Sequence, residues 1–183
     1  LDSMACAKGC AHFDSLKIPF CCVAADSGSG SEVILREGGL AQAMRASMAI
    51  PGVFKPVDRG DYKLVDGGML NNLPVDVCRQ MGADIVIAVD LQQNDQKPRQ
   101  QTDLSAFSAI ADLIGVGGIL NWILNRPDIE KYIANREQAD ILIHPYLPDY
   151  DVTSFGNKIA ARMIQSGVDA TRQLLPQIHA LDK

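Results

Sequence analysis

Two short apolar segments separated by small polar residues stand out near the start of the chain. The run "IPFCCVAAD" at residues 18–26 passes into the turn-rich "DSGSGS" at 26–31, and "EVILREGG" at 32–39 resumes as an extended segment. This pattern predicts a strand, a turn and a second strand.

The next segments alternate between helical and extended patterns. Residues 40–50 carry leucine and methionine at helical spacing, and Pro51 and Gly52 follow them, so a helix is predicted there. The apolar "YKLV" at 62–65 predicts a strand that leads directly into Asp66.

A strand, helix and strand unit is predicted from residue 63 to 90. Pro74 near the start of "LPVDVCRQMG" and Gly82 at its end are typical of a helix. The β-branched run "ADIVIAVD" at 83–90 is typical of a strand buried on both faces in a parallel sheet. A right-handed crossover is the expected connection between the strands.

The C-terminal third repeats this alternation. "ADILIHP" at 139–145 predicts another strand. A helix that lies along the sheet is predicted next, and Pro176 is expected to interrupt it. Its apolar positions share one face: Ile159, Met163, Gly167, Ala170 and Leu174. Strands alternating with helices indicate one layered α/β domain.

The apolar segment at residues 104–124 raises the question of a membrane span. Asp112 near its centre and several glycines argue against a span, because a charge at mid-bilayer is costly and glycine weakens helices. A buried or lipid-facing amphipathic helix is favoured. Trp122 in this segment is expected to pack in a core rather than on a bilayer.

Composition fits a soluble globular domain. The chain has 183 residues, 47% of them hydrophobic and 21% charged. A net charge of −5 with scattered basic residues excludes a nucleic-acid partner. No glycine-rich phosphate motif follows a strand, which excludes a Rossmann-type nucleotide binder.

The five cysteines do not suggest a complete disulfide framework and fit a reducing compartment better. Cys6, Cys10 and His12 superficially suggest a metal site, but no CxxC pair occurs. Small buried residues are the favoured interpretation of the cysteines, and neither a metal nor a cofactor is expected.

The chemistry of the chain centres on "LVDGGMLNNLPVD" at residues 64–76. Catalytic groups of α/β folds gather at the carboxyl ends of strands, where Asp66 is placed. The glycines that follow leave space beside its carboxylate. Capping of a turn explains the same spacing equally well. Asn71 and Asn72 are expected to form a turn, with fixing of the Asp66 loop as the alternative.

The ordered series "VAAD", "LAQAMRASMAIPGVFKPV", "LVDGGMLNNLPVDVCRQMGADIVIAVDL" and "ADILIHPYL" resembles the patatin-like phospholipase family over about residues 13–175. The resemblance implies a three-layer α/β/α sandwich with a mostly parallel central sheet and hydrolysis of lipid acyl esters. It places the aspartate of a Ser–Asp dyad at Asp66. Gly67 and Gly68 complete an Asp-Gly-Gly motif, which the family also has as Asp-Gly-Ala.

The family's nucleophile elbow, G-x-S-x-G, and its glycine-rich oxyanion loop are both missing. Ser29, Ser47 and Ser154 do not have glycine at both positions two residues away, as the elbow requires, and "GVGG" at 115–118 comes too late in the chain. We therefore expect residues 1–183 to be the C-terminal portion of a single catalytic domain. The serine is expected in an absent N-terminal segment, which leaves this chain inactive alone.

The partners expected from this interpretation are a lipid or acyl ester, peripheral contact with a membrane, and the N-terminal segment or a surface that replaces it. A cytoplasmic or membrane-associated bacterial location is favoured. Arg45 is expected as a solvated charge, with contact to a lipid phosphate as the alternative. The competing function is a noncatalytic fragment or degenerate homologue that binds lipid or acts as a scaffold.

Overall fold

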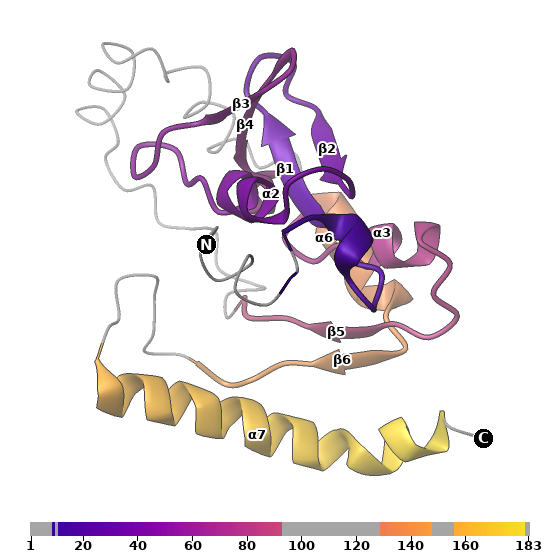
Figure 1. Ribbon diagram of the computed structural model, residues 1–183. Helices are drawn as coiled ribbons and strands as arrows, with labels where there is room; N and C mark the ends of the chain where they lie inside the picture. The colour runs from indigo at the N-terminus through magenta and orange to yellow at the C-terminus, as the bar shows by residue number, and fades with distance from the viewer. Residues whose placement is uncertain (1–8, 10, 93–128, 148–155, 182–183) are drawn as a thin grey trace. The chain divides into compact units, whose positions relative to one another are not determined.

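The computed structural model describes residues 9, 11–92, 129–147 and 156–181 (Figure 1). The chain divides into two compact units, residues 1–72 with 103–132, and residues 73–102 with 133–183. Both units combine strands with helices. The α/β class is therefore confirmed.

The strands of the first unit are β1 (Cys22–Asp26), β2 (Glu32–Leu35), β3 (Val57–Arg59) and β4 (Tyr62–Asp66). They form one sheet in the order β2-β1-β4-β3, and every pair in it is antiparallel. The predicted strand, turn and strand over residues 18–39 is thus confirmed. The connections at residues 27–31 and 60–61 are far too short for the crossover that a parallel pair needs.

The expected three-layer sandwich around a mostly parallel sheet is not confirmed, because this larger sheet is antiparallel. The predicted crossover unit over residues 63–90 is not found among the described residues either. β4 pairs with β1 and β3, whereas β5 (Ile87–Val89) pairs with another strand in a second sheet. The apolar pattern of β5 predicted a parallel strand correctly, but the pattern does not determine which strand pairs with it.

The predicted helix after the hairpin is α2 (Leu40–Ser47), which packs against β1 and β4. Ala43 and Ala46 are fully buried on its inner face. Alanine brings the helix close to the sheet, because it adds little bulk between the two. The core of this unit also includes Phe13, from the short η1 (Phe13–Ser15), and Leu64 of β4.

In the second unit, β5 pairs in parallel with β6 (Ile141–Ile143). Two helices precede these strands in the sequence, α3 (Val75–Gln80) before β5 and α6 (Ile129–Gln138) before β6, and the division between the two units falls within α6, after Tyr132. α3 follows Pro74 and is closed by Gly82, whose φ of +92° lies in the left-handed region that favours glycine. The predicted boundaries of this helix are confirmed.

The expectation that β5 is buried on both faces is wrong for the described structure. Ala88 is buried, but Ile87 and Val89 on the other face are 47% and 54% exposed. The described elements cover one face of this strand and leave the other open. The strand therefore alternates in burial although its sequence is apolar throughout.

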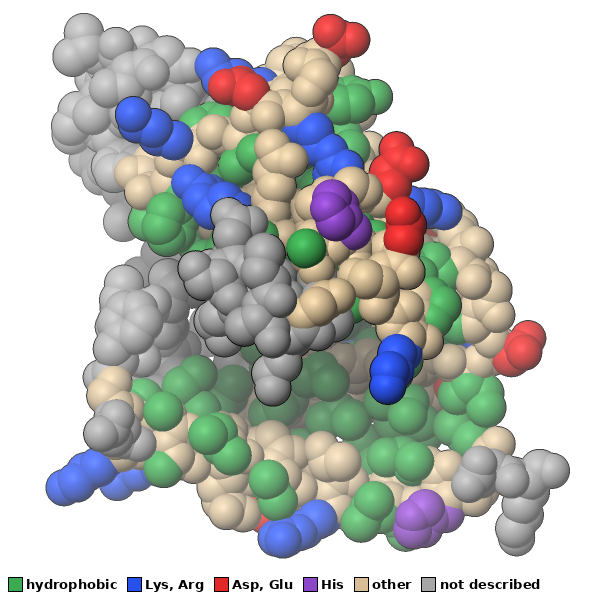
Figure 2. Space-filling model, in the orientation of Figure 1, with side chains coloured by type: hydrophobic (Ala, Val, Ile, Leu, Met, Phe, Trp, Pro, Cys, Tyr) green, Lys and Arg blue, Asp and Glu red, His purple; other side chains and the backbone are tan. Residues whose placement is uncertain are grey.

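The long C-terminal helix, α7 (Asn157–Ala180), packs against β6 (Figure 1). Its predicted apolar face is confirmed, since Ile159, Met163 and Leu174 are half-buried at helical spacing. The predicted interruption is wrong, because the helix continues through Pro176 to Ala180. Proline removes one helical hydrogen bond, which a helix of this length tolerates. Further hydrophobic side chains remain exposed along α7 (Figure 2), among them Ile164.

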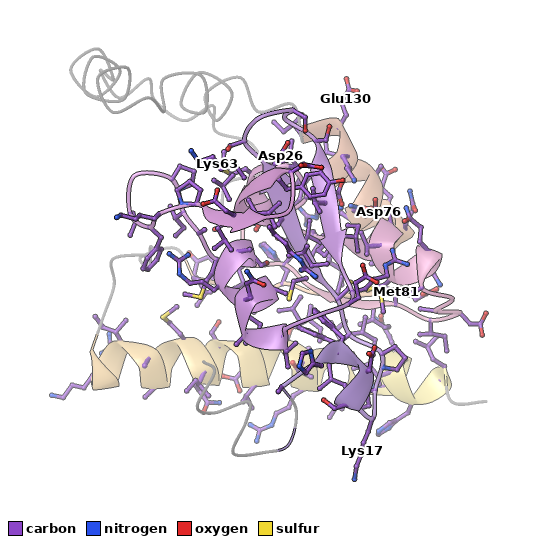
Figure 3. All side chains as sticks on the ribbon, turned by 45° about the horizontal axis from the view of Figure 1, so that its top comes forward. Lys17, Asp26, Lys63, Asp76, Met81 and Glu130 are labelled. Carbon is purple, nitrogen blue, oxygen red and sulfur yellow. The ribbon has the colours of Figure 1, made fainter. Side chains whose placement is uncertain are left out.

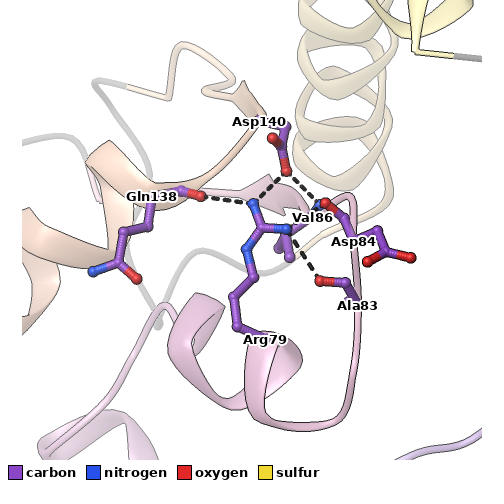
Figure 4. Close-up of polar contacts among 6 residues, drawn as sticks. All are labelled: Arg79, Ala83, Asp84, Val86, Gln138 and Asp140. Atoms are coloured by element: carbon purple, nitrogen blue, oxygen red, sulfur yellow. Dashed lines mark hydrogen bonds and ion pairs between the residues drawn. The ribbon is translucent and has the colours of Figure 1, made fainter.

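Arg79 of α3 ties the connections of the second unit together (Figure 4). Its guanidinium donates to the Asp84 carbonyl at 2.5 Å, the Gln138 carbonyl at 3.2 Å and the Asp140 carboxylate at 2.5 Å. The same carboxylate accepts the Val86 N–H at 2.7 Å. This bond is the main reason why the pKa of Asp140 lies below its ordinary value, and the arginine adds to it.

The structure tests several sequence predictions only in part, because some of the residues concerned lie outside the described segments. Cys22 is buried as expected, and burial raises its pKa to about 11, whereas Cys78 is exposed. No helix in the described segments is long and apolar enough to cross a bilayer. Residues 104–124, with Trp122, and the Cys6–Cys10 pair lie outside those segments.

Candidate active site

Asp66 is the last residue of β4, and hydrogen bonds fix its backbone from two directions. It lies opposite Ala24 of β1 in the antiparallel register. Its N–H donates to the carbonyl of Ala49, just beyond α2, at 3.0 Å. The sheet and the segment after α2 therefore both set the position of this residue.

The Asp66 carboxylate is half-buried and accepts the Gly68 N–H at Oδ1, at 2.8 Å. This bond caps η2 (Gly67–Met69), so the turn-capping alternative drawn from the sequence is present in the structure. Burial raises the pKa of the Asp66 carboxyl, and the Gly68 N–H opposes that rise in part. None of the other described residues donates a hydrogen bond to this carboxylate. It is therefore a carboxylate with raised affinity for a proton.

Gly67 lets the chain turn against the backbone of β1. A Cβ at this position would lie 2.1 Å from the Val23 carbonyl oxygen and 2.8 Å from the Ala24 nitrogen. Backbone atoms of a central strand cannot move aside by the distance required. Only glycine therefore fits directly after Asp66.

The atoms nearest to Gly68 belong to side chains, and the closest of them can move aside. A Cβ there would lie 2.6 Å from Oδ1 of Asn72, an exposed side chain that can rotate, and 3.1 Å from Oδ1 of Asp66. An alanine therefore fits after a small adjustment. This difference gives a physical reason why the motif named by the sequence resemblance has glycine first and either glycine or alanine second.

The two asparagines play different parts in this loop. Asn71 is 4% exposed, and its backbone N–H donates to the Gly67 carbonyl at 2.9 Å. Its side-chain Nδ2 donates to Oε1 of Glu32 on β2, at 3.0 Å. Asn72 is exposed. The structure therefore joins Asn71 to the Asp66 loop, the alternative that the sequence favoured less.

Asp26 was not among the predicted site residues, although it ends the quoted "VAAD" run. It lies at the end of β1 close to Lys63 (Figure 3). Its carboxylate accepts the Ser29 hydroxyl at 2.7 Å, the Ser29 N–H at 2.9 Å and the Lys63 N–H at 2.9 Å. These bonds, the Ser29 hydroxyl first, lower its pKa to about 2. Asp26 therefore locks the β1–β2 turn onto β4.

Asp26→Asn should lower the melting temperature at pH 7, and the difference from wild type should vanish as the pH falls towards 2. The pKa in the folded state, about 2, lies below the ordinary 3.8, so the ionised group stabilises the fold above that ordinary value. This stability is lost as the pH falls through the folded pKa. Thermal melts of both proteins from pH 2 to 7 measure it, with the exposed Asp58→Asn as control. A pH-independent difference would contradict the charged role of Asp26.

The remaining polar candidates have local roles. The Ser29 hydroxyl donates a hydrogen bond to Asp26, and no serine of the described segments donates to Asp66. Arg45 is less solvated than expected, because it donates to the Lys55 carbonyl at 3.0 Å and lies 5.1 Å from the centre of the Phe54 ring. It fixes the loop after α2. Ser154 lies outside the described residues.

The sequence profile of the patatin-like phospholipase family matches residues 23–79. This segment runs from β1 through Asp66 to α3, so it contains the whole loop just described. The resemblance to the patatin-like phospholipases is confirmed. The match rests on the same strands, helix and Asp-Gly-Gly turn that build the candidate site.

Individual relatives agree with this family. An uncharacterized NTE family protein of Mycobacterium tuberculosis is 37% identical over 110 residues, which is 60% of this chain and 18% of the relative. Patatin-like phospholipase domain-containing protein 6 of Homo sapiens is 35% identical over 98 residues, 52% of this chain and 7% of the relative. Protein 7 of the same series, from Rattus norvegicus, is 34% identical over 98 residues, again 52% of this chain and 7% of the relative. The chain thus spans under a fifth of the length of these relatives.

Proposed function

We propose that this chain supplies the aspartate of a Ser–Asp dyad in a lipid acyl hydrolase. One observation carries the proposal: Asp66 ends a strand inside the matched segment, and burial raises its pKa. A carboxylate with raised proton affinity is a better general base than an exposed one. The names of the relatives, which include phospholipase domains, support a lipid ester as the substrate.

The reaction we propose has two halves. The serine hydroxyl attacks the acyl carbonyl while Asp66 accepts the hydroxyl proton, which forms a tetrahedral intermediate. Collapse breaks the ester bond, and Asp66 returns the proton to the departing alcohol oxygen. Water then attacks the acyl-serine while Asp66 accepts a proton from it. Collapse of the second tetrahedral intermediate breaks the acyl–serine bond, Asp66 returns the proton to the serine oxygen, and the fatty acid is released. Backbone N–H groups outside the described loop would stabilise the intermediate's oxyanion.

We further propose that both units belong to one three-layer catalytic domain, whose serine and oxyanion loop lie N-terminal to residue 1. The open apolar face of β5 supports this proposal, because Ile85, Ile87, Val89 and Leu91 are all 46–60% exposed. The small share of the relatives that this chain spans supports it as well. Peripheral contact with a membrane would bring the domain to its lipid substrate.

The test is fatty-acid release from phosphatidylcholine vesicles by the longer protein that contains this chain, with residues 1–183 assayed alongside. We expect free fatty acid from the longer protein and background release from the 183-residue chain. Release of the phosphorylated head group instead would contradict an acyl hydrolase. Hydrolysis by residues 1–183 alone would place the nucleophile inside this chain and contradict the proposed dyad.

A noncatalytic role as a lipid-binding or scaffolding module has one observation in its favour. Asp66 already serves the fold, because its carboxylate caps the Gly68 N–H. In that case the longer protein would bind the same vesicles without releasing fatty acid. The vesicle assay therefore separates the two functions when bound protein is measured by sedimentation in the same samples.

A further inference from the structure

The Gly67–Gly68 peptide, one residue after Asp66, is held by Asn71. The Gly67 carbonyl accepts two backbone N–H groups, from Leu70 at 3.0 Å and from Asn71 at 2.9 Å. This carbonyl belongs to the turn whose Gly68 N–H binds the Asp66 carboxylate. A shift of Asn71 would therefore move the donor that orients Asp66.

Asn71 is in turn held from β2 and α6. Its side-chain amide donates to Oε1 of Glu32 at 3.0 Å, and Oε2 of Glu32 pairs with Lys131. The Glu32 side chain is 20% exposed and the Lys131 side chain 36%. A buried amide is costly without a partner, so this glutamate fixes where the Asn71 side chain lies. Three segments far apart in the sequence thus meet behind the Asp66 loop.

We propose that Glu32 and Asn71 are positioning residues for Asp66. This inference rests on the proposed function of Asp66 as the general base. Neither residue needs to touch the substrate, since both act through the Gly67–Gly68 turn. A misplacement of a reacting group by about 1 Å can cost about 10²-fold in rate, so loss of this support should appear in kcat.

The test is a paired exchange in the longer protein, with a soluble p-nitrophenyl butyrate substrate. Asn71→Asp places a carboxylate against Glu32 and should lower the plateau kcat by about 10²-fold. Adding Glu32→Gln restores a donor and an acceptor, because the new amide can donate to the new carboxylate and accept from Lys131. The double variant should regain kcat to within about tenfold of wild type on the same geometric argument. Glu37→Gln, an exposed glutamate five positions along the chain, is the matched charge control and should stay at the wild-type rate.

A purely structural role gives a different result. In that case Asn71→Asp would lower the melting temperature but leave the plateau kcat of the folded protein unchanged, which would overturn the inference. Failure of the double variant to regain kcat would overturn the Glu32–Asn71 pairing. Activity that is lost in Asp66→Asn but unchanged in both single variants would leave the proposed function intact and reject the positioning role.

An inactive wild type would reject the proposed function, and the positioning role would then be measured directly. The Asp66 carboxyl carbon can be titrated by NMR in each variant. We expect its titration midpoint to be displaced in Asn71→Asp and to return in the double variant, which carries the same net charge as wild type. A midpoint that does not move in the single variant, or that stays displaced in the double variant, would contradict the inference.

Discussion

Asp66→Asn should lower kcat of the longer protein for ester hydrolysis by about 10⁴-fold, the scale of loss seen when the aspartate of a serine-hydrolase triad becomes an asparagine. The amide has nearly the same shape, and its oxygen can still accept the Gly68 N–H that now binds Oδ1 of Asp66. It cannot accept the serine proton. The loss is therefore expected in kcat, measured with p-nitrophenyl butyrate at saturating concentration.

The pH dependence and stability of this variant add two checks. Wild-type activity should fall as the pH drops through the Asp66 pKa, which burial raises above 3.8, and this limb should disappear in Asp66→Asn. Because the buried charge costs stability at neutral pH, the variant should melt at or above the wild-type temperature at pH 7. Asp58→Asn, on the exposed side of β3, should match wild type in rate. A wild-type kcat in Asp66→Asn would contradict the role of Asp66 as a general base and would leave only its role as a cap of the turn.

Gly67→Ala should abolish stable folding or lower the free energy of unfolding by more than about 3 kcal/mol, beyond the usual range for overpacking. The new methyl group would meet the Val23 carbonyl oxygen at 2.1 Å and its carbon at 2.4 Å. Relief of this clash requires η2 to move away from β1, which would also break the Asp66–Gly68 hydrogen bond. Denaturant unfolding of the longer protein, together with its soluble yield, measures the effect.

Gly68→Ala is the matched control for this change. The same methyl group one position later meets the movable end of Asn72, so the cost should stay within about 1 kcal/mol, as for a tolerated substitution. Activity should remain measurable, with a smaller loss than in Asp66→Asn, because Oδ1 of Asp66 lies 3.1 Å from the new atom. Equal stability of the two alanine variants would contradict the close approach of Gly67 to β1.

Local patterns were sufficient to predict most elements of the fold. Alternating segments around "DSGSGS" gave the β1–β2 hairpin, and Pro74 with Gly82 gave the limits of α3. Strand neighbours were not predictable in the same way, because an apolar run such as "ADIVIAVD" carries no information about which strand lies beside it. The continuation of α7 through Pro176 was missed because the rule that proline ends a helix is local, whereas α7 is a 24-residue helix that packs against β6 and tolerates the loss of one hydrogen bond.

The sequence predicted only some of the residues of the candidate site. The motif indicated Asp66 and its two glycines, since a strand followed by an acid and Gly-Gly is a local signal. Glu32 and Lys131 come together with Asn71 only through folding, because Glu32 precedes Asn71 by 39 positions and Lys131 follows Glu32 by 99. No local pattern marks such partners. A polar residue at a half-buried strand position, as Glu32 is in "EVIL", is the one signal that could have suggested it.

The most direct measurement is covalent labelling of the longer protein with a fluorophosphonate, which reacts with activated serines, followed by peptide mapping. We expect one rapidly labelled serine in a G-x-S-x-G segment N-terminal to residue 1. We also expect a labelling rate about 10⁴-fold lower in Asp66→Asn, because the same proton transfer activates the serine. A labelled serine whose rate does not change in Asp66→Asn, or no labelled serine at all, would contradict the assignment of Asp66 as its base.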